Sequence, residues 1–171
     1  NSASILLTET DKAYVDVTDN LTFLNDNSFI WTSEKDGYNH IYHYGKKGKL
    51  IRQVTDGDWE VTAYYGFDKK SEKIYYQSVE NGSTNRGVYV IGLNGKNKQL
   101  LSKKEGTNSA SFSADFTYFI NTFSSASTPP EFTLNAANNG IVLKRIKHND
   151  KLAKKLSNYR LSEKEFSTIA I

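Results

Sequence analysis

The chain repeats itself with a period in the mid-forties. Three turns headed by an aromatic residue begin at Phe23, Phe67 and Phe112, which lie 44 and 45 residues apart. Each turn precedes a short apolar run rich in aromatic and β-branched residues, which favour strands. Repeats of this length built from short strands are typical of β-propeller blades. A single blade cannot bury both faces of its sheet, so three blades predict a piece of something larger.

Each repeat contains the same order of four strands and three connections. The Asp36-Gly37 pair is a hairpin signal, whereas Pro129 and Pro130 cannot donate ladder hydrogen bonds and belong in a loop. The expected strands are 21–24, 28–33, 40–44 and 50–55, then 59–65, 73–78, 87–91 and 98–102, then 109–112, 117–123, 131–135 and 140–145. The sequence therefore predicts an all-β fold, a partial β-propeller of about three four-stranded antiparallel blades spanning roughly 14–58, 59–108 and 109–147.

The pattern changes at both ends of the chain. Asn149 or Asp150 is a candidate cap for a short helix over 151–159, and a strand is expected over 165–171. A separate strand is expected over 4–7. Both ends resemble pieces of neighbouring elements, with 148–171 leading away from the blades. Because the chain begins at Asn1 and contains no Met, we expect a processed product or an excised fragment.

Composition excludes several classes of protein and site. The mean hydropathy is −0.60 and no long apolar stretch occurs, so neither a membrane span nor a signal peptide is expected. The net charge of +3 comes from interspersed charges of both signs, which argues against a nucleic-acid partner. The chain has no Cys, which excludes disulfides, thiolate metal sites and a cysteine nucleophile. No cofactor is predicted.

Hydrolytic chemistry needs an activated Ser, a His base and an orienting carboxylate. The three histidines are His40, His43 and His148, and no Gly-x-Ser-x-Gly elbow occurs. We expect the histidines to be structural or solvated, and we predict no catalytic residue in this chain.

Metal sites and acid–base pairs are weakly indicated. One stretch is rich in acidic and amide residues but lacks the Gly and distal Glu of a calcium loop, so turn residues explain it: Asp16, Asp19, Asn20, Asn25 and Asp26. No metal site is predicted. Two pairs, Trp59-Glu60 and Glu131-Phe132, place a carboxylate beside an aromatic residue. We expect Trp59 to pack between blades while Glu60 faces solvent. The sequons at Asn20 and Asn81 would carry glycan only in a eukaryotic secretory setting.

Several segments resemble the propeller of the dipeptidyl peptidase IV family of serine exopeptidases. Residues 33–42, Ser-Glu-Lys-Asp-Gly-Tyr-Asn-His-Ile-Tyr, resemble the family's Ser-Glu-x-Asp/Glu-Gly-Tyr-x-His-Ile/Leu segment. Residues 57–61 resemble its Gly-x-Trp-Glu-Val segment, and residues 9–15 resemble its Glu-Thr-Asp-x-Ala-Trp-Val segment with Tyr14 for Trp. Residues 162–166 resemble the stretch where the propeller passes into the α/β-hydrolase domain.

The resemblance implies a parent enzyme that pairs an eight-bladed propeller with a C-terminal α/β-hydrolase domain carrying a Ser-Asp-His triad. Such enzymes remove N-terminal dipeptides after Pro or Ala, and a pair of Glu earlier in the propeller holds the substrate amine. This chain would be a non-catalytic propeller fragment that shapes the access of peptide substrates, and its partners would be the remaining blades and the hydrolase domain. The absence of Cys and the Lys- and Asn-rich composition favour a bacterial homologue that is periplasmic or secreted.

One pair of positions carries a possible substrate contact. Animal members of the family place a Phe-Arg pair after the Trp-Val segment to line the substrate cleft, and counting from Val15 puts Thr18 and Asp19 there. Both residues differ from the family pattern, and Asp brings the opposite charge. The alternative from another class is a β-propeller that binds proteins or glycans without a hydrolase domain. A closed β-sandwich would instead show no blade repeat.

Overall fold

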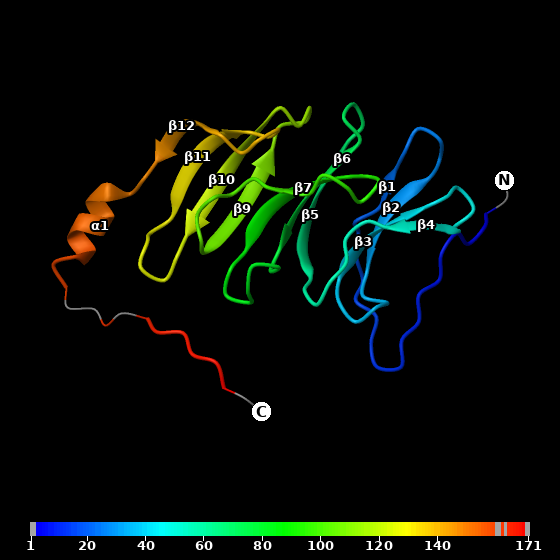
Figure 1. The fold of residues 1–171 in the computed structure, drawn as a ribbon, viewed down its shortest axis with the longest axis horizontal. Coiled ribbons are helices and arrows are strands. Elements are labelled where there is room, and N and C mark those ends of the chain that lie inside the picture. The colour runs from blue at the N-terminus through cyan, green and yellow to red at the C-terminus, as the bar shows by residue number, and fades with distance from the viewer. Residues whose placement is uncertain (1–2, 160–161, 163, 170–171) are drawn as a thin grey trace.

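The computed structural model describes residues 3–159, 162 and 164–169. It contains three four-stranded antiparallel sheets and one short helix, α1 (Asp150–Leu156). The sheets follow one another along the chain and stand side by side, with α1 beyond the third sheet (Figure 1). None of the described sheets closes on itself. The fold is the expected partial β-propeller of three blades.

Every blade is a simple meander in which strand order equals chain order. Blade 1 consists of β1 (Thr22–Phe23), β2 (Phe29–Ser33), β3 (His40–Tyr44) and β4 (Leu50–Gln53). Blade 2 consists of β5 (Val61–Asp68), β6 (Lys73–Ser78), β7 (Gly87–Gly92) and β8 (Gln99–Leu100). Blade 3 consists of β9 (Thr107–Phe112), β10 (Tyr118–Ser124), β11 (Glu131–Ala136) and β12 (Val142–Lys147). Pro129 and Pro130 lie in the loop between β10 and β11, as predicted.

Most of the core lies between the sheets, in two interfaces that we call seam 1–2 and seam 2–3 after the blades they join. A third buried cluster, of Phe29, Tyr42 and Tyr44, lies on blade 1 against Leu7 and Trp31. In seam 1–2, Ile30 and Ile41 of blade 1 belong to one buried cluster with Ile74, Tyr76 and other residues of blade 2. In seam 2–3, a second cluster joins residues of both blades: Tyr75, Val88, Val90, Leu101, Phe119 and Ala137. Burial between neighbouring sheets therefore supplies the hydrophobic stabilisation that one blade lacks.

Aromatic rings fill much of seam 1–2. Trp59 stacks on Tyr76, with ring centroids 6.4 Å apart, and Tyr76 stacks on Tyr89 at 5.5 Å. His40 meets Trp59 edge-on at 4.9 Å. Glu60 is exposed, so the prediction that Trp59 packs between blades while Glu60 faces solvent is confirmed.

Each blade has a glycine in the turn between its last two strands. This glycine lets the backbone of the segment just before the blade approach the turn closely. Gly48, Gly95 and Gly140 have φ values of 75°, 73° and 72°, which favour glycine. A Cβ added at Gly95 would lie 3.3 Å from the Val54 carbonyl oxygen. A Cβ at Gly48 or Gly140 would overlap the carbonyl oxygen of Leu6 or Leu101. The same backbone contact thus recurs at all three blades.

Both predicted terminal strands are wrong in the described residues. Residues 4–7 form no strand, and neither do residues 165–169, while 170 and 171 lie outside the described part of the chain. A strand needs a hydrogen-bonded neighbour, and neither segment has one here. Leu6 nevertheless lies against Gly48, in the position that Leu101 takes against Gly140.

The C-terminal helix is shorter than predicted. It ends at Leu156, and residues 157–159 form turns. Asn149 is its N-cap in a left-handed conformation, and its side chain makes no capping bond; Asn149 Nδ2 donates to the Pro130 carbonyl oxygen (2.5 Å). Leu152 and Leu156 are both exposed, so the helix buries no apolar face.

We expect Gly140→Ala to destabilise the protein far more than Gly37→Ala. Both glycines have a positive φ, but nothing lies within 4 Å of a Cβ at Gly37, whereas Gly140 abuts the Leu101 backbone. Gly37→Ala should cost about 1 kcal/mol from backbone strain alone, and Gly140→Ala roughly 3 kcal/mol because the backbone of Leu101 must move. Urea unfolding of the two variants measures the difference. Equal losses would contradict a spacing role for Gly140.

Candidate functional site

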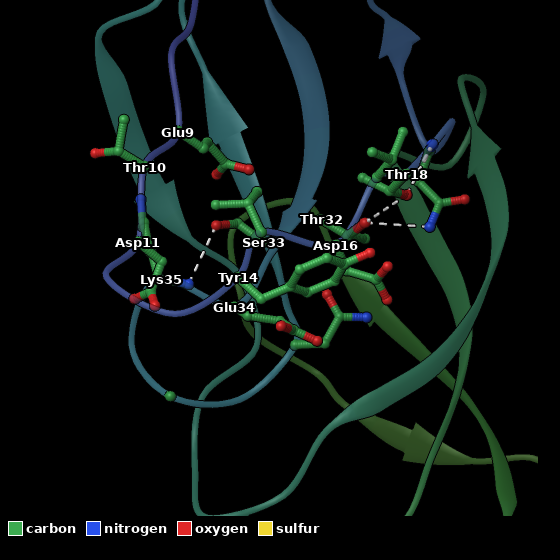
Figure 2. A pocket seen from close by; sticks show the side chains of 15 residues that line it. Glu9, Thr10, Asp11, Tyr14, Asp16, Thr18, Thr32, Ser33, Glu34 and Lys35 are labelled. Atoms are coloured by element: carbon green, nitrogen blue, oxygen red, sulfur yellow. Dashed lines mark hydrogen bonds between the residues drawn. The ribbon is translucent and has the colours of Figure 1, made fainter.

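A polar hollow, which we call the rim hollow, lies where the segment before β1 crosses the end of β2 (Figure 2). Its volume is about 480 Å³. The lining comes from two stretches of the chain and the β2–β3 turn: Glu9, Thr10, Asp11, Tyr14, Val15, Asp16, Val17, Thr18, Asn20, Thr32, Ser33, Glu34, Lys35, Gly37 and Asn39. Blade 1 therefore holds the floor, and the irregular segment forms one wall.

Short-range hydrogen bonds shape this wall and attach it to the blade. Asp11 Oδ1 accepts from the Ala13 backbone N–H (2.8 Å), and Thr18 Oγ1 accepts from the Asn20 N–H (3.2 Å). Asn20 Nδ2 donates to Thr32 Oγ1 (3.1 Å), and the Thr18 and Thr32 hydroxyls lie 3.3 Å apart. Thr32 on β2 thus anchors the end of the wall that carries Thr18.

The rim hollow is acidic. Four carboxylates, those of Glu9, Asp11, Asp16 and Glu34, line it together with the single ammonium group of Lys35. Lys35 Nζ lies 3.8 Å from the centre of the Tyr42 ring and donates to Tyr44 Oη (2.9 Å), so its charge is already engaged by aromatic groups. Glu9 Oε2 accepts from Trp31 Nε1 (3.2 Å). The arrangement suits a cationic group or a hydrogen-bond donor rather than an anion.

The structure separates the two predicted substrate-cleft residues. Thr18 lines the rim hollow, whereas Asp19 is exposed beside it and its side chain is not part of the lining. Sequence reasoning did not select Glu9, Tyr14, Glu34 or Lys35. A signal was present, because residues 9–15 and 33–42, which carry the family resemblance, are the two segments that meet at the hollow.

Ser28, His43 and Asp26 come together with Ser28, rather than the histidine, as the middle group. Ser28 Oγ donates to Asp26 Oδ1 (2.5 Å), and His43 Nε2 lies 2.9 Å from the same hydroxyl oxygen. Because the single hydroxyl proton of Ser28 goes to Asp26, its oxygen accepts from His43. In a nucleophilic triad the His stands between the Ser and the carboxylate. Ser28 is also 2 % exposed, so no substrate reaches it.

The other two histidines also sit in local contacts. His40 is fully buried, with Nε2 3.0 Å from the Gly57 carbonyl oxygen and Nδ1 3.1 Å from Thr55 Oγ1. A carbonyl only accepts, so Nε2 carries the proton and Nδ1 accepts from Thr55. His148 Nδ1 lies 3.6 Å from Glu131 Oε1. His40 and His43 are thus structural residues, as expected.

The remaining candidates are dispersed. Among residues 3–159, 162 and 164–169, no three His, Asp or Glu side chains gather closely enough to hold a metal ion. Asn20 of the first sequon donates to Thr32, whereas Asn81 of the second is exposed in the β6–β7 turn. No helix in the described part of the chain is long and apolar enough to cross a membrane.

Comparison with known proteins connects this geometry to one family. The sequence model of the family "Dipeptidyl peptidase IV (DPP IV) N-terminal region" matches residues 1–130. The chain is 32 % identical over 145 residues to a dipeptidyl peptidase 4 of Arthroderma otae and, over the same length, to that of Trichophyton rubrum. Each match covers 84 % of this chain and 19 % of the relative.

A solved structure is similar over almost the whole chain. The crystal structure of Porphyromonas gingivalis dipeptidyl peptidase 4 matches 95 % of this chain with a TM-score of 0.88 and 40 % sequence identity. The matched part is 23 % of that protein. The chain therefore spans about a fifth of the length of the proteins it resembles.

We expect His43 to make stability fall on mild acidification. Burial lowers the pKa of His43 below its ordinary value of 6.5, so at and just below that pH the unfolded chain binds a proton that the folded chain does not. The free energy of unfolding should therefore drop between about pH 7.5 and about pH 5.5, and His43→Gln should reduce this slope. Urea unfolding across this range measures both. If the free energy of unfolding fell equally with pH in the unaltered protein and in His43→Gln, folding would not hinder protonation of His43.

Proposed function

The chain belongs to the dipeptidyl peptidase IV N-terminal region family, and from this membership we propose that it is the non-catalytic propeller part of a serine-type dipeptidyl peptidase. The observation that carries the proposal is a three-blade arc that matches about a fifth of such enzymes and in which Ser28, His43 and Asp26 are ordered wrongly for hydrolysis. Its role is to shape the cavity through which a peptide reaches the triad of the hydrolase domain.

The partners of the arc are further blades and the α/β-hydrolase domain of the parent chain. At the N-terminal side, Leu6 stands against Gly48 as Leu101 stands against Gly140, so residues 4–7 take the place of the outer strand of a preceding blade. Beside them lies an apolar hollow of about 510 Å³, lined by Leu7, Phe23, Phe29 and other residues. The missing inner strands of that blade would fill this hollow.

At the C-terminal side, the outward face of blade 3 exposes large apolar side chains. Tyr118 and Ile120 are 46 % and 41 % exposed, whereas their neighbour Phe119 is buried against blade 2. A following blade or domain would cover them, as blade 2 covers blade 1. We take 14–58, 59–108 and 109–147 as the blade limits and 148–171 as the link toward the hydrolase domain.

The substrate of the parent enzyme is a peptide with an accessible N-terminus, from which a dipeptide ending in Pro or Ala is removed. Thr18 and the acidic rim hollow support a place for this region beside the peptide, because peptide N-termini are cationic. We further propose a bacterial enzyme of the periplasm or the exterior, in keeping with the 40 % identity to the Porphyromonas gingivalis protein.

The isolated chain should release no Gly-Pro from a chromogenic Gly-Pro substrate. The longer protein that includes the hydrolase domain should release it. Both are compared at equal molar concentration, with circular dichroism to show that the short chain is folded. Turnover by the short chain would overturn its assignment as non-catalytic, and inactivity of the folded longer protein would overturn the peptidase assignment.

Asp19→Asn in the longer protein should weaken its preference for substrates with a basic N-terminal residue. An exposed carboxylate near the peptide contributes a screened attraction, so the ratio of kcat/KM for Lys-Pro over Gly-Pro substrates should fall about two- to fivefold. Glu105→Gln removes another exposed carboxylate, in the segment between blades 2 and 3, and is the matched control. An unchanged ratio would remove Asp19 from the substrate cleft.

A further inference from the structure

Three Asn-Gly pairs occur in this chain, and they begin at Asn81, Asn94 and Asn139. In such a pair the backbone nitrogen of the glycine can attack the side-chain amide of the asparagine, because glycine has no Cβ to hinder the approach. The three pairs lie in three different turns, β6–β7, β7–β8 and β11–β12. Their surroundings differ, and this difference predicts different reactivities.

The side chains of Asn94 and Asn139 are held by their own turns. Asn94 Oδ1 accepts from the Lys96 backbone N–H (3.0 Å). Asn139 Oδ1 accepts from the Ile141 backbone N–H (3.0 Å). Within the described part of the chain the side chain of Asn81 makes no hydrogen bond, and Asn81 is exposed. Its amide is therefore free to rotate toward the nitrogen of the next residue.

The backbone of the three glycines differs in the same sense. A Cβ on Gly140 would overlap the Leu101 carbonyl oxygen. A Cβ on Gly95 would lie 3.3 Å from the Val54 carbonyl oxygen. At Gly82 the nearest heavy atom to such a Cβ is the end of a side chain, 3.7 Å away. Gly82 is exposed, Gly95 is half-buried and Gly140 is buried, so the β6–β7 turn can rearrange where the other two are clamped.

The glycine N–H groups do not distinguish the three turns. Each donates to a backbone carbonyl oxygen at 2.8 to 2.9 Å, and that of Gly82 donates to Val79. This bond must open before the nitrogen reacts. The β6–β7 connection spans residues 79–86 and lies at the surface, where such bonds open most readily. The selection therefore comes from the free amide of Asn81 and from the freedom of its turn.

We propose that Asn81-Gly82 is a site of spontaneous deamidation, selected by its turn from the three Asn-Gly pairs. The Gly82 nitrogen loses its proton to hydroxide and attacks Asn81 Cγ. A C–N bond forms, the Cγ–Nδ2 bond breaks, and Nδ2 leaves as ammonia with a proton taken from water. Water then opens the succinimide ring. Addition at Cγ gives aspartate, and addition at the backbone carbonyl carbon gives isoaspartate, with the glycine N–H restored in both products.

The reaction consumes one water and releases one ammonia, without oxidation or reduction. It needs only this chain and water, so it is independent of the peptidase assignment.

The product adds a negative charge to a basic hollow. Beside the β6–β7 turn lies a hollow of about 420 Å³, whose lining includes Asn81, Arg86, Lys103, Lys104 and Glu105. In the part of the chain that the structure describes, Arg86 forms no ion pair. A carboxylate at position 81 would thus meet an available guanidinium group, which favours its retention in the folded chain.

Peptide mapping of the folded chain, aged in mildly alkaline buffer, tests the proposal. Deamidation raises the mass of a peptide by about 1 Da. Trypsin separates the three pairs into peptides 74–86, 87–96 and 105–144, in which tandem mass spectrometry locates the altered residue. Asn81 should convert roughly tenfold faster than Asn94 and Asn139, because the clamped turns must open first. Equal rates at the three pairs, in a chain that circular dichroism shows to be folded, would overturn the proposal.

The same measurement in urea supplies the reference for intrinsic reactivity. In the unfolded chain the three pairs have the same reacting groups and no turn, so their rates should agree within about threefold. A tenfold preference for Asn81 that persisted in urea would assign the effect to the neighbouring sequence and would overturn selection by the turn.

Two substitutions in the turn test the route through the Gly82 nitrogen. Gly82→Ala places a methyl group beside this nitrogen and should slow conversion at Asn81 severalfold. Thr84→Ala, at an exposed position of the same turn, leaves both reacting groups and should convert as the unaltered protein does. An isoaspartate-specific methyltransferase should label peptide 74–86 of the aged protein. Unchanged conversion in a folded Gly82→Ala protein, or aspartate as the only product, would contradict ring closure.

Discussion

Face-to-face burial between neighbouring sheets is the interaction on which the structure depends. Each blade is a four-stranded meander, and the seams remove the facing sides of neighbouring blades from water. On blade 1, a further buried cluster of Phe29, Tyr42 and Tyr44 packs against Leu7 of the N-terminal segment. Blade 2 is covered on both sides by neighbouring blades, whereas the outer face of blade 1 is covered in part by the N-terminal segment and blade 3 exposes Tyr118 and Ile120. The matching arc makes up 23 % of the Porphyromonas gingivalis protein.

The sequence predicted the elements whose partners are local. Hairpins join strands that are close in the chain, so periodicity and turn residues were sufficient to find the three blades and the loop at Pro129 and Pro130. The two predicted terminal strands were wrong because a strand over 4–7 or 165–169 needs a hydrogen-bonded neighbour from a different element. The hydrogen bond from Asn149 Nδ2 to the Pro130 carbonyl oxygen likewise depends on a tertiary contact, which the local sequence around the helix does not reveal.

The candidate site was less predictable than the fold, because it combines residues that are distant in the chain. Counting along the sequence located Thr18, but only the packing of residues 9–20 on β2 shows that Glu9 and Lys35 share its hollow. Sequence alone also could not pair Ser28 with His43, which are joined across a hairpin, nor show that the hydroxyl proton points to Asp26. The direction of one proton, rather than the presence of the residue types, decides against a nucleophile.

The recurring approach of Gly48, Gly95 and Gly140 to a neighbouring carbonyl has a consequence for how such arcs diversify. Main-chain atoms, not side chains, fix the separation of adjacent blades at these points. The interior between two blades can consequently exchange bulky rings for amides, as Tyr76 and Asn121 illustrate, while the backbone contact at the outer turn is kept.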